Sequence, residues 1–307
     1  MEETHNHHHH HHAHVHEVKS LNGIFILSIA LNAAFVAVEA AVGLWQGSLS
    51  LLSDAGHNLG DVFSLLLVLA GFRLAAVHTS KRFTYGLRKS TVLISLLNAV
   101  ILLVAVGVII LESVHKLMEP AEVDGAAVSW TAFAGIIVNG ATALLLMKGQ
   151  KGDLNVRGAF LHMAADTLVS VGVVASGLVI TFTGWNAVDP IVSLIIAAVI
   201  LASTWSLLAE SLRLSVDGTP EGIDADRVVA EMAACPHVKD VHHVHIWAMS
   251  TTTNALTAHV VVDDLGAMEQ AKADIKARLK EAGIAHSTLE METPASHCAD
   301  HGMQYGG

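Results

Sequence analysis

Six long apolar segments set the strongest limit on how this chain folds. They lie near residues 21–44, 49–74, 90–116, 126–148, 157–182 and 188–210. A hydrocarbon core takes about 20 helical residues to cross, so each segment is long enough for one span. The chain is 52% hydrophobic and only 15% charged, which is too apolar for an ordinary soluble domain. The pattern predicts an all-α transmembrane domain of six spans over residues 20–212.

The distribution of basic residues predicts the orientation of these spans. Lysine and arginine gather around the second and fourth connections, as Arg73, Lys81, Arg82, Arg88, Lys89, Lys148, Lys151 and Arg157. The first, third and fifth connections carry little positive charge beyond Lys116. By the positive-inside rule, both termini are expected in the cytoplasm. The short loops and the lack of eukaryotic targeting features favour a bacterial inner membrane.

The last third of the chain changes character and predicts a small soluble domain over residues 213–293. Residues 224–234 and 267–282 have helical patterns, and β-rich runs cover 238–249, 254–262 and 285–293. The order αββαβ predicts an α+β layer with helices on one face of a mixed sheet. The two cysteines of the chain, Cys235 and Cys298, make no disulfide framework, and the net charge of -11 argues against nucleic acid as a partner.

Two of the apolar segments carry the same pair of metal-ligand residues at the same spacing. His57 and Asp61 are four residues apart, and so are His162 and Asp166, so each pair shares one helix face. Two facing helices would bring two imidazoles and two carboxylates together, a set that suits tetrahedral zinc. Because ionisable groups at membrane depth are costly, such residues are functional candidates. Asp54 lies on the same face and is a candidate for the ion pathway.

Histidines and glutamates of the soluble domain suggest a second metal site. By strand alternation, His245, His259 and Glu292 lie on polar faces, with His286 nearby. If those faces meet, the three residues could bind zinc; the alternative is a solvated polar face.

Both ends of the chain are also rich in metal ligands. Residues 1–19 are predicted to be a disordered tail with His5, His14 and His16 around the run 7–12. Six consecutive histidines are typical of a purification tag, but the flanking histidines favour a native metal-attracting tail. The flexible segment 294–307 adds His297, Cys298 and His301, a peripheral ligand cluster or simply a solvated end.

Taken together, these stretches resemble the cation diffusion facilitator family, in its zinc-transporting branch. The matching stretches are 48–61 (SLSLLSDAGHNLGD), 82–97 (RFTYGLRKSTVLISLL), 158–166 (GAFLHMAAD), 188–190, 245–247 and 258–260. The resemblance implies a homodimer of six-span subunits with a cytoplasmic ferredoxin-like domain. It also implies export of a metal ion in exchange for protons.

The resemblance assigns roles to particular residues of this chain. The transport site of the family maps onto His57, Asp61, His162 and Asp166, and a dimer-interface site onto His245, His259 and Glu292, with His286 adjacent. Two features depart from the family. Tyr85 stands where some members have a histidine, and residues 149–153 replace the long His-rich loop of animal members.

The expected function is secondary active transport of Zn²⁺, with Cd²⁺ and Co²⁺ as alternatives, and not enzyme catalysis. Zn²⁺ is also the expected regulatory ligand of the soluble domain. A membrane metalloprotease would need a His-Glu-x-x-His motif, and the His-Glu pair of this chain is His16-Glu17 in the tail. Four protein ligands would also leave no position for a catalytic water. A membrane-anchored metal sensor and a passive zinc channel stay open as alternatives.

Overall fold

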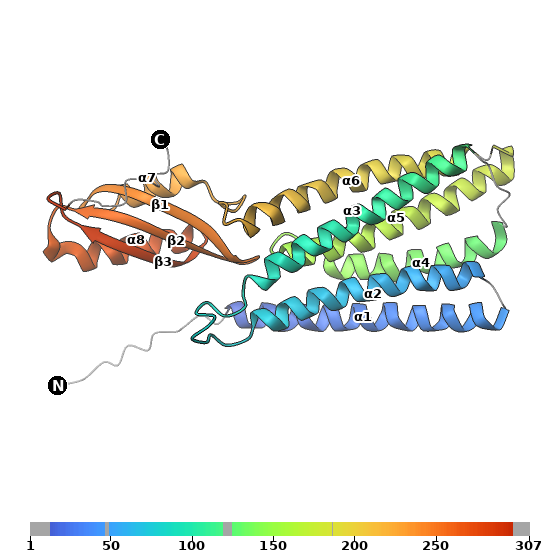
Figure 1. Cartoon of the computed structure of the whole chain (residues 1–307), viewed down its shortest axis with the longest axis horizontal. Helices are drawn as coiled ribbons and strands as arrows, with labels where there is room; N and C mark the ends of the chain where they lie inside the picture. Colours follow the sequence, from blue (N-terminus) through green and yellow to red (C-terminus); the bar gives the residue numbers. More distant parts are fainter. Residues whose placement is uncertain (1–12, 47–48, 119–124, 186, 297–307) are drawn as a thin grey trace, which may run out of the picture.

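A bundle of long helices and a small sheet domain at one end of it make up the protein (Figure 1). The computed structural model describes residues 13–46, 49–118, 125–185 and 187–296. The N-terminal histidine run and the cluster of His297, Cys298 and His301 lie outside these ranges.

The helices of the bundle follow the predicted apolar segments. They are α1 (Ala13–Gln46), α2 (Leu49–Ala75), α3 (Ser90–Met118), α4 (Gly125–Leu146), α5 (Leu154–Thr183) and α6 (Val188–Ser215). One prediction was wrong: α1 starts at Ala13, so residues 13–19 are helical where a disordered tail was expected. Extending a formed helix adds one backbone hydrogen bond per residue without a new nucleation step. A helix can therefore continue beyond the apolar segment that crosses the membrane.

Exposed apolar side chains show which faces of the bundle meet lipid. Within the described residues, five helices are long and apolar enough to cross a membrane, and α4 contributes the shorter apolar stretch Phe133–Leu146. Only 22% of Gly23–Val42 and 39% of Asn58–Ala75 is buried inside the protein. Large side chains such as Leu111 and Val104 point outward. A soluble protein does not expose so much contiguous apolar surface, whereas a bilayer covers it.

Polar contacts between helices hold the bundle together. Helix α3 packs along α6, α4 along α5, and α1 along α2, while α5 also contacts α2 and α3. Asn32 Nδ2 of α1 donates to Thr142 Oγ1 of α4 at 3.0 Å. The hydroxyls of Ser95 and Ser211 join α3 to α6 at 2.9 Å. Such hydrogen bonds link helices where lipid offers no competing partner.

The small domain is a three-stranded sheet with two helices on one face. In chain order it comprises α7 (Ala225–Ala233), β1 (Val238–Ser250), β2 (Thr253–Val262), η1 (Leu265–Ala267), α8 (Met268–Glu281) and β3 (Ile284–Glu292). The sheet order is β1-β2-β3, with β1 antiparallel and β3 parallel to β2. The predicted order of elements and the mixed sheet are confirmed.

Alternation along β2 separates a core face from a polar face. Leu256, Ala258, Val260 and Val262 are buried against α7 and α8. The residues between them, including His259, face the other way. The histidines of the sheet therefore lie on the face that these helices do not cover.

The turn between β1 and β2 contacts the helical bundle. Thr251 Oγ1 donates to Asp153 Oδ2 at 2.9 Å, and Asp153 Oδ1 caps α5 by accepting from Asn155 N at 2.7 Å. Nearby, Lys89, the residue before α3, donates through Nζ to Asp217 Oδ1 at 2.6 Å and to Ala248 O of β1 at 3.0 Å. The junction thus joins the residues just before α3 and α5 to the hairpin.

We predict that Asp153→Asn changes the pH dependence of stability. Burial raises the pKa of the Asp153 carboxyl, so the fold favours its protonated form. The free energy of unfolding is then highest at acid pH and falls as the pH rises through the raised pKa. A neutral asparagine can still cap α5 through its amide oxygen and donate its amide N–H to the Thr251 hydroxyl, and it lacks this fall. In thermal unfolding, the melting temperature of the variant relative to wild type should rise with pH.

Asp153→Ala is the matched control, since it removes the cap and the Thr251 contact at every pH. Its free energy of unfolding should lie about 1 kcal/mol below that of Asp153→Asn at every pH, with the same trend relative to wild type, because both variants lack the titrating carboxyl. A melting temperature of Asp153→Asn that drops relative to wild type as the pH rises would contradict the prediction.

Candidate functional site

Helices α2 and α5 carry the predicted membrane ligands. His57 and Asp61 lie one turn apart on α2, and His162 and Asp166 lie one turn apart on α5. The side chains of His57 and Asp54 lie outside the described part of the structure. For these two, the structure gives the position on α2 only.

The other three predicted side chains meet between the two helices. His162 Nε2 lies 2.7 Å from Asp61 Oδ1 and 3.8 Å from Asp166 Oδ2. Asp61 is 1% exposed and His162 is 7% exposed, so the contact is closed to bulk water. Three potential ligand atoms lie within 4.8 Å of one another. Asp61, His162 and Asp166 therefore come together as the four-residue spacing predicted.

Charge and spacing both suit a divalent cation at this place. Two ionised carboxylates in a low-dielectric bundle carry a charge of -2, which one divalent ion balances. A tetrahedral zinc ion with bonds of about 2.0–2.2 Å holds its ligand atoms about 3.3–3.6 Å apart. The observed separations of 2.7 and 3.8 Å lie on either side of that value. Small side-chain movements would bring the three atoms onto one ion, with room for a fourth ligand.

A polar pair from α1 and α2 lies close to these ligands along α2. Asn58 Nδ2 donates to Glu39 Oε2 at 2.8 Å, and Glu39 is 5% exposed. Asn58 falls between His57 and Asp61 in the sequence. The buried Glu39 carboxylate is therefore held by α2, so α1 adds a further acidic group to this part of the bundle.

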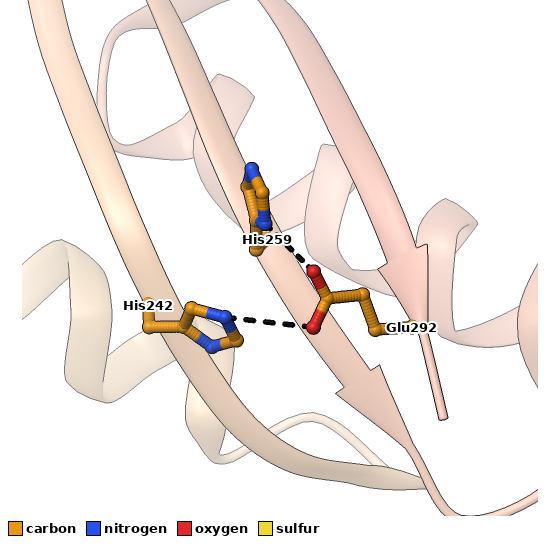
Figure 2. A group of neighbouring side chains, drawn as sticks. All are labelled: His242, His259 and Glu292. Atoms are coloured by element: carbon orange, nitrogen blue, oxygen red, sulfur yellow. Dashed lines mark hydrogen bonds and ion pairs between the residues drawn. The ribbon is translucent and has the colours of Figure 1, made fainter. Parts of the chain in front are cut away.

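A second cluster of ligand atoms lies on the polar face of the sheet (Figure 2). The carboxylate of Glu292 lies between two imidazoles, with Oε1 at 2.7 Å from His259 Nδ1 and Oε2 at 3.5 Å from His242 Nε2. These three residues come from β3, β2 and β1, and their ligand atoms lie within 4.8 Å of one another. The side chains of Glu292 and His259 are 9% and 14% exposed.

The composition of this second cluster differs from the predicted set. His259 and Glu292 come together as expected, but His242 takes the place that His245 was expected to fill. The register explains the difference, because His242 pairs with His259 whereas His245 pairs with Thr257, with a register shift between them. His245 is exposed on the same face, further along the strand. His286 pairs with Ala255, and its ring packs on Tyr85 with centroids 5.8 Å apart.

Strand alternation alone could not select His242. A regular strand places residues 242 and 244 on one face and 243 and 245 on the other, so an alternating pattern puts His242 toward the core. The irregularity in β1 reverses that parity for His242. The only local signal is the pair of adjacent histidines at 242 and 243, since histidine is one of the residues that accept a positive φ angle.

The fold and its two clusters define a class of protein. The chain has several membrane-length helices, a buried group of metal ligands between two of them, and a small domain with a second ligand group. Sequence comparison agrees: the profile of the cation efflux transmembrane domain matches residues 25–214, and that of the cation efflux protein cytoplasmic domain matches residues 220–293. The chain belongs to the cation efflux, or cation diffusion facilitator, family and is a multi-pass membrane protein.

Relatives with described activities align over most of the chain. The "Cadmium, cobalt and zinc/H(+)-K(+) antiporter" of Bacillus subtilis is 33% identical over 277 residues, 89% of each chain. The "Metal cation efflux system protein CzcD" of Cupriavidus metallidurans is 33% identical over 91% of this chain and 89% of its own. The "Zinc transporter ZitB" of Escherichia coli is 32% identical over 92% and 90%. These proteins confirm the resemblance to the zinc, cadmium and cobalt branch of the family.

We predict that the two clusters bind separate metal ions, because one group lies between α2 and α5 and the other on the sheet. Asp61→Ala should remove one equivalent of tightly bound Zn²⁺ per chain, and His259→Ala should remove another. The double variant should lack both. Equilibrium dialysis of the purified protein with metal analysis measures the stoichiometry. Unchanged stoichiometry in both single variants would contradict the prediction.

Proposed function

We propose that this protein exports divalent metal cations in exchange for protons. Zn²⁺ is the foremost substrate, with Cd²⁺ and Co²⁺ as alternatives that accept the same ligands. The ion binds to His57, Asp61, His162 and Asp166 between α2 and α5, and alternating access opens this site to each side in turn. The names of the three relatives support metal efflux, and that of the Bacillus subtilis protein supports antiport.

One observation supports the proposed exchange of metal for protons: His162 Nε2 lies 2.7 Å from Asp61 Oδ1. At this distance one of the two atoms holds a proton, because two facing lone pairs would repel each other. A nitrogen or oxygen that binds a metal ion must give up its proton. The same atoms therefore hold either a proton or a metal ion. Metal entry displaces the proton, and proton entry on the other side of the membrane displaces the metal.

The direction of transport follows from the proton gradient. An imidazole titrates close to ambient pH, so a more acidic outer side favours the protonated site and releases the ion there. On the cytoplasmic side, where protons are scarcer, the ligands bind metal again. Asp54 lies near the N-terminal end of α2, on the outer side of the site, and lines the exit in this scheme.

The arrangement in the membrane that this function requires has six spans. Helix α4 has 22 residues, about 33 Å of helix, which matches a hydrocarbon core of about 30 Å. The bundle then covers residues 20–212 in a bacterial inner membrane, with the His-rich tail (1–19), the soluble domain (213–293) and the end segment (294–307) in the cytoplasm. The positive charges around the second and fourth connections support this orientation.

The soluble domain acts as a dimerisation and metal-sensing unit in this proposal. Its element order αββαβ is compatible with a ferredoxin-like fold that pairs two subunits into a homodimer. His242, His259 and Glu292 bind a regulatory Zn²⁺ and take the place of the predicted set with His245 and His286. Cytoplasmic zinc would then stabilise the transporting form of the dimer.

Two alternative functions predict zinc transport behaviour that differs from that of an antiporter. A membrane-anchored sensor would bind zinc without moving it across the bilayer. A passive zinc channel would move it at a rate independent of the proton gradient.

We predict that proteoliposomes with an acidic interior take up Zn²⁺ in a gradient-dependent way. Asp61→Ala should reduce the initial rate by about tenfold or more, since even partners that only orient metal ligands change affinity by that much. Glu112→Ala is the matched control, because it removes a carboxylate from α3 outside both clusters and should leave the rate unchanged. A fluorescent zinc indicator inside the vesicles measures the rate.

The outcomes separate the three functions. Uptake that survives in Asp61→Ala means that the transport site lies elsewhere. Uptake that ignores the gradient identifies a channel. Bound zinc without uptake in either protein identifies a sensor.

A further inference from the structure

Next to the sheet cluster, β1 has an irregularity at His243. Between His242 and His245 the register of β1 against β2 shifts, and His243 has a φ angle of 49°. A residue with a side chain seldom adopts this left-handed conformation, and in β1 it falls at the middle one of three register shifts against β2. Strained backbone of this kind persists where the surrounding structure holds it, and it is found often at binding sites.

The irregularity brings a third imidazole beside the other two. The ring centroid of His243 lies 5.5 Å from that of His242 and 5.1 Å from that of His259. The rings of His242 and His259 are themselves 5.4 Å apart. In a regular strand, consecutive side chains point to opposite faces, so His242 and His243 could not both approach His259. The shift in register is what makes a compact group of three imidazoles.

His243 is buried without a hydrogen-bond partner for its distal nitrogen. The residue is 5% exposed, and Nε2 has no hydrogen bond within the part of the chain that the structure describes. A buried polar atom without a partner is costly, and an apolar side chain of similar size would fill the same space without that cost. A role in packing alone therefore leaves both the strained backbone and the unsatisfied nitrogen unexplained.

The surrounding carboxylates orient the other two imidazoles for metal binding. His242 presents Nε2 to Glu292, while its Nδ1 lies 3.1 Å from Asp240 Oδ2. His259 presents Nδ1 to Glu292, while its Nε2 lies 3.5 Å from Glu290 Oε2. In metal sites, the nitrogen that does not bind the ion commonly donates its hydrogen to a carboxylate. Asp240 and Glu290 occupy those outer positions.

We propose that His243 is the fourth ligand of a His₃Glu site for Zn²⁺ or a similar cation, formed within one chain by His242, His243, His259 and Glu292. This inference rests on the proposed role of the soluble domain in metal binding and adds the residue that closes the site. Four protein ligands leave no position for a substrate or catalytic water, which is typical of a structural or regulatory ion. The ion joins β1, β2 and β3, and so holds the irregular part of β1 against the sheet.

The test compares Co²⁺ binding to the full-length protein and to His243→Gly. Glycine accepts the positive φ angle without strain, so this variant removes the imidazole and keeps the backbone. Tetrahedral Co²⁺ absorbs visible light more strongly than Co²⁺ with additional water ligands. We expect weaker bands, and an affinity lower by about tenfold or more. Added imidazole should restore the bands by filling the vacated ligand position.

His245→Ala is the matched control, because His245 is an exposed histidine of the same strand that pairs with Thr257 and lies further along β1 than the three imidazoles. It should bind Co²⁺ as the wild type does. The N-terminal histidines are present in every variant and cancel in the difference spectra.

A further variant, His259→Ala, separates failure of this inference from failure of the sheet site itself. Loss of bound Co²⁺ in His259→Ala, with wild-type bands and affinity in His243→Gly, would overturn the fourth ligand and keep a three-ligand site. No loss in His259→Ala would overturn both. Weaker binding in His243→Gly that imidazole does not restore, together with a lower melting temperature of the metal-free protein, would assign His243 to packing and overturn the inference.

Discussion

The contact between His162 and Asp61 inside the bundle is the interaction on which the rest of the structure depends. The Asp61 carboxylate and the His162 imidazole are buried there, with the partly buried Asp166 carboxylate beside them, in a bundle where an unbalanced charge is very costly. This energetic cost is offset when a proton or a metal cation binds among these three side chains. Helices α2 and α5 must therefore hold these side chains together, and the remaining helices exclude water and cover the polar faces. A site that needs a positive charge at all times is also a site at which protons and metal ions compete.

The two ligand clusters are joined through a short chain of contacts. The β1–β2 hairpin carries His242 and His259, and its turn reaches Thr251, which donates a hydrogen bond to Asp153. Asp153 caps α5, the helix that carries His162 and Asp166. In the proposed function, a cation bound to the sheet cluster therefore acts on a hairpin that is hydrogen-bonded to the N-cap of α5. Lys89, which directly precedes α3, strengthens the same junction through its contacts to Asp217 and Ala248.

Most of the fold and the membrane cluster could be predicted from local patterns. Apolar length defines the helices of the bundle, because a bilayer requires long runs of hydrophobic residues with internal hydrogen bonds. The spacing of four residues between histidine and aspartate places both on one helix face, and this periodicity does not depend on the neighbours. The sheet cluster was predicted less well. His259 and Glu292 come together as predicted, but alternation along β1 selected His245 in place of His242.

By itself, the sequence determined the succession of spans, the order of strands and helices in the soluble domain, and which residues of α2 and α5 carry metal-binding chemistry. These follow from composition and from the helical and strand periods, which are properties of short segments. Only the tertiary structure decided which histidines of β1 approach Glu292, and that α5 and the hairpin meet at Asp153 and Thr251. The physical reason is that a shift in register is a compromise between two strands. Its position depends on how β1 packs against β2 and the core, and no local pattern in β1 specifies it.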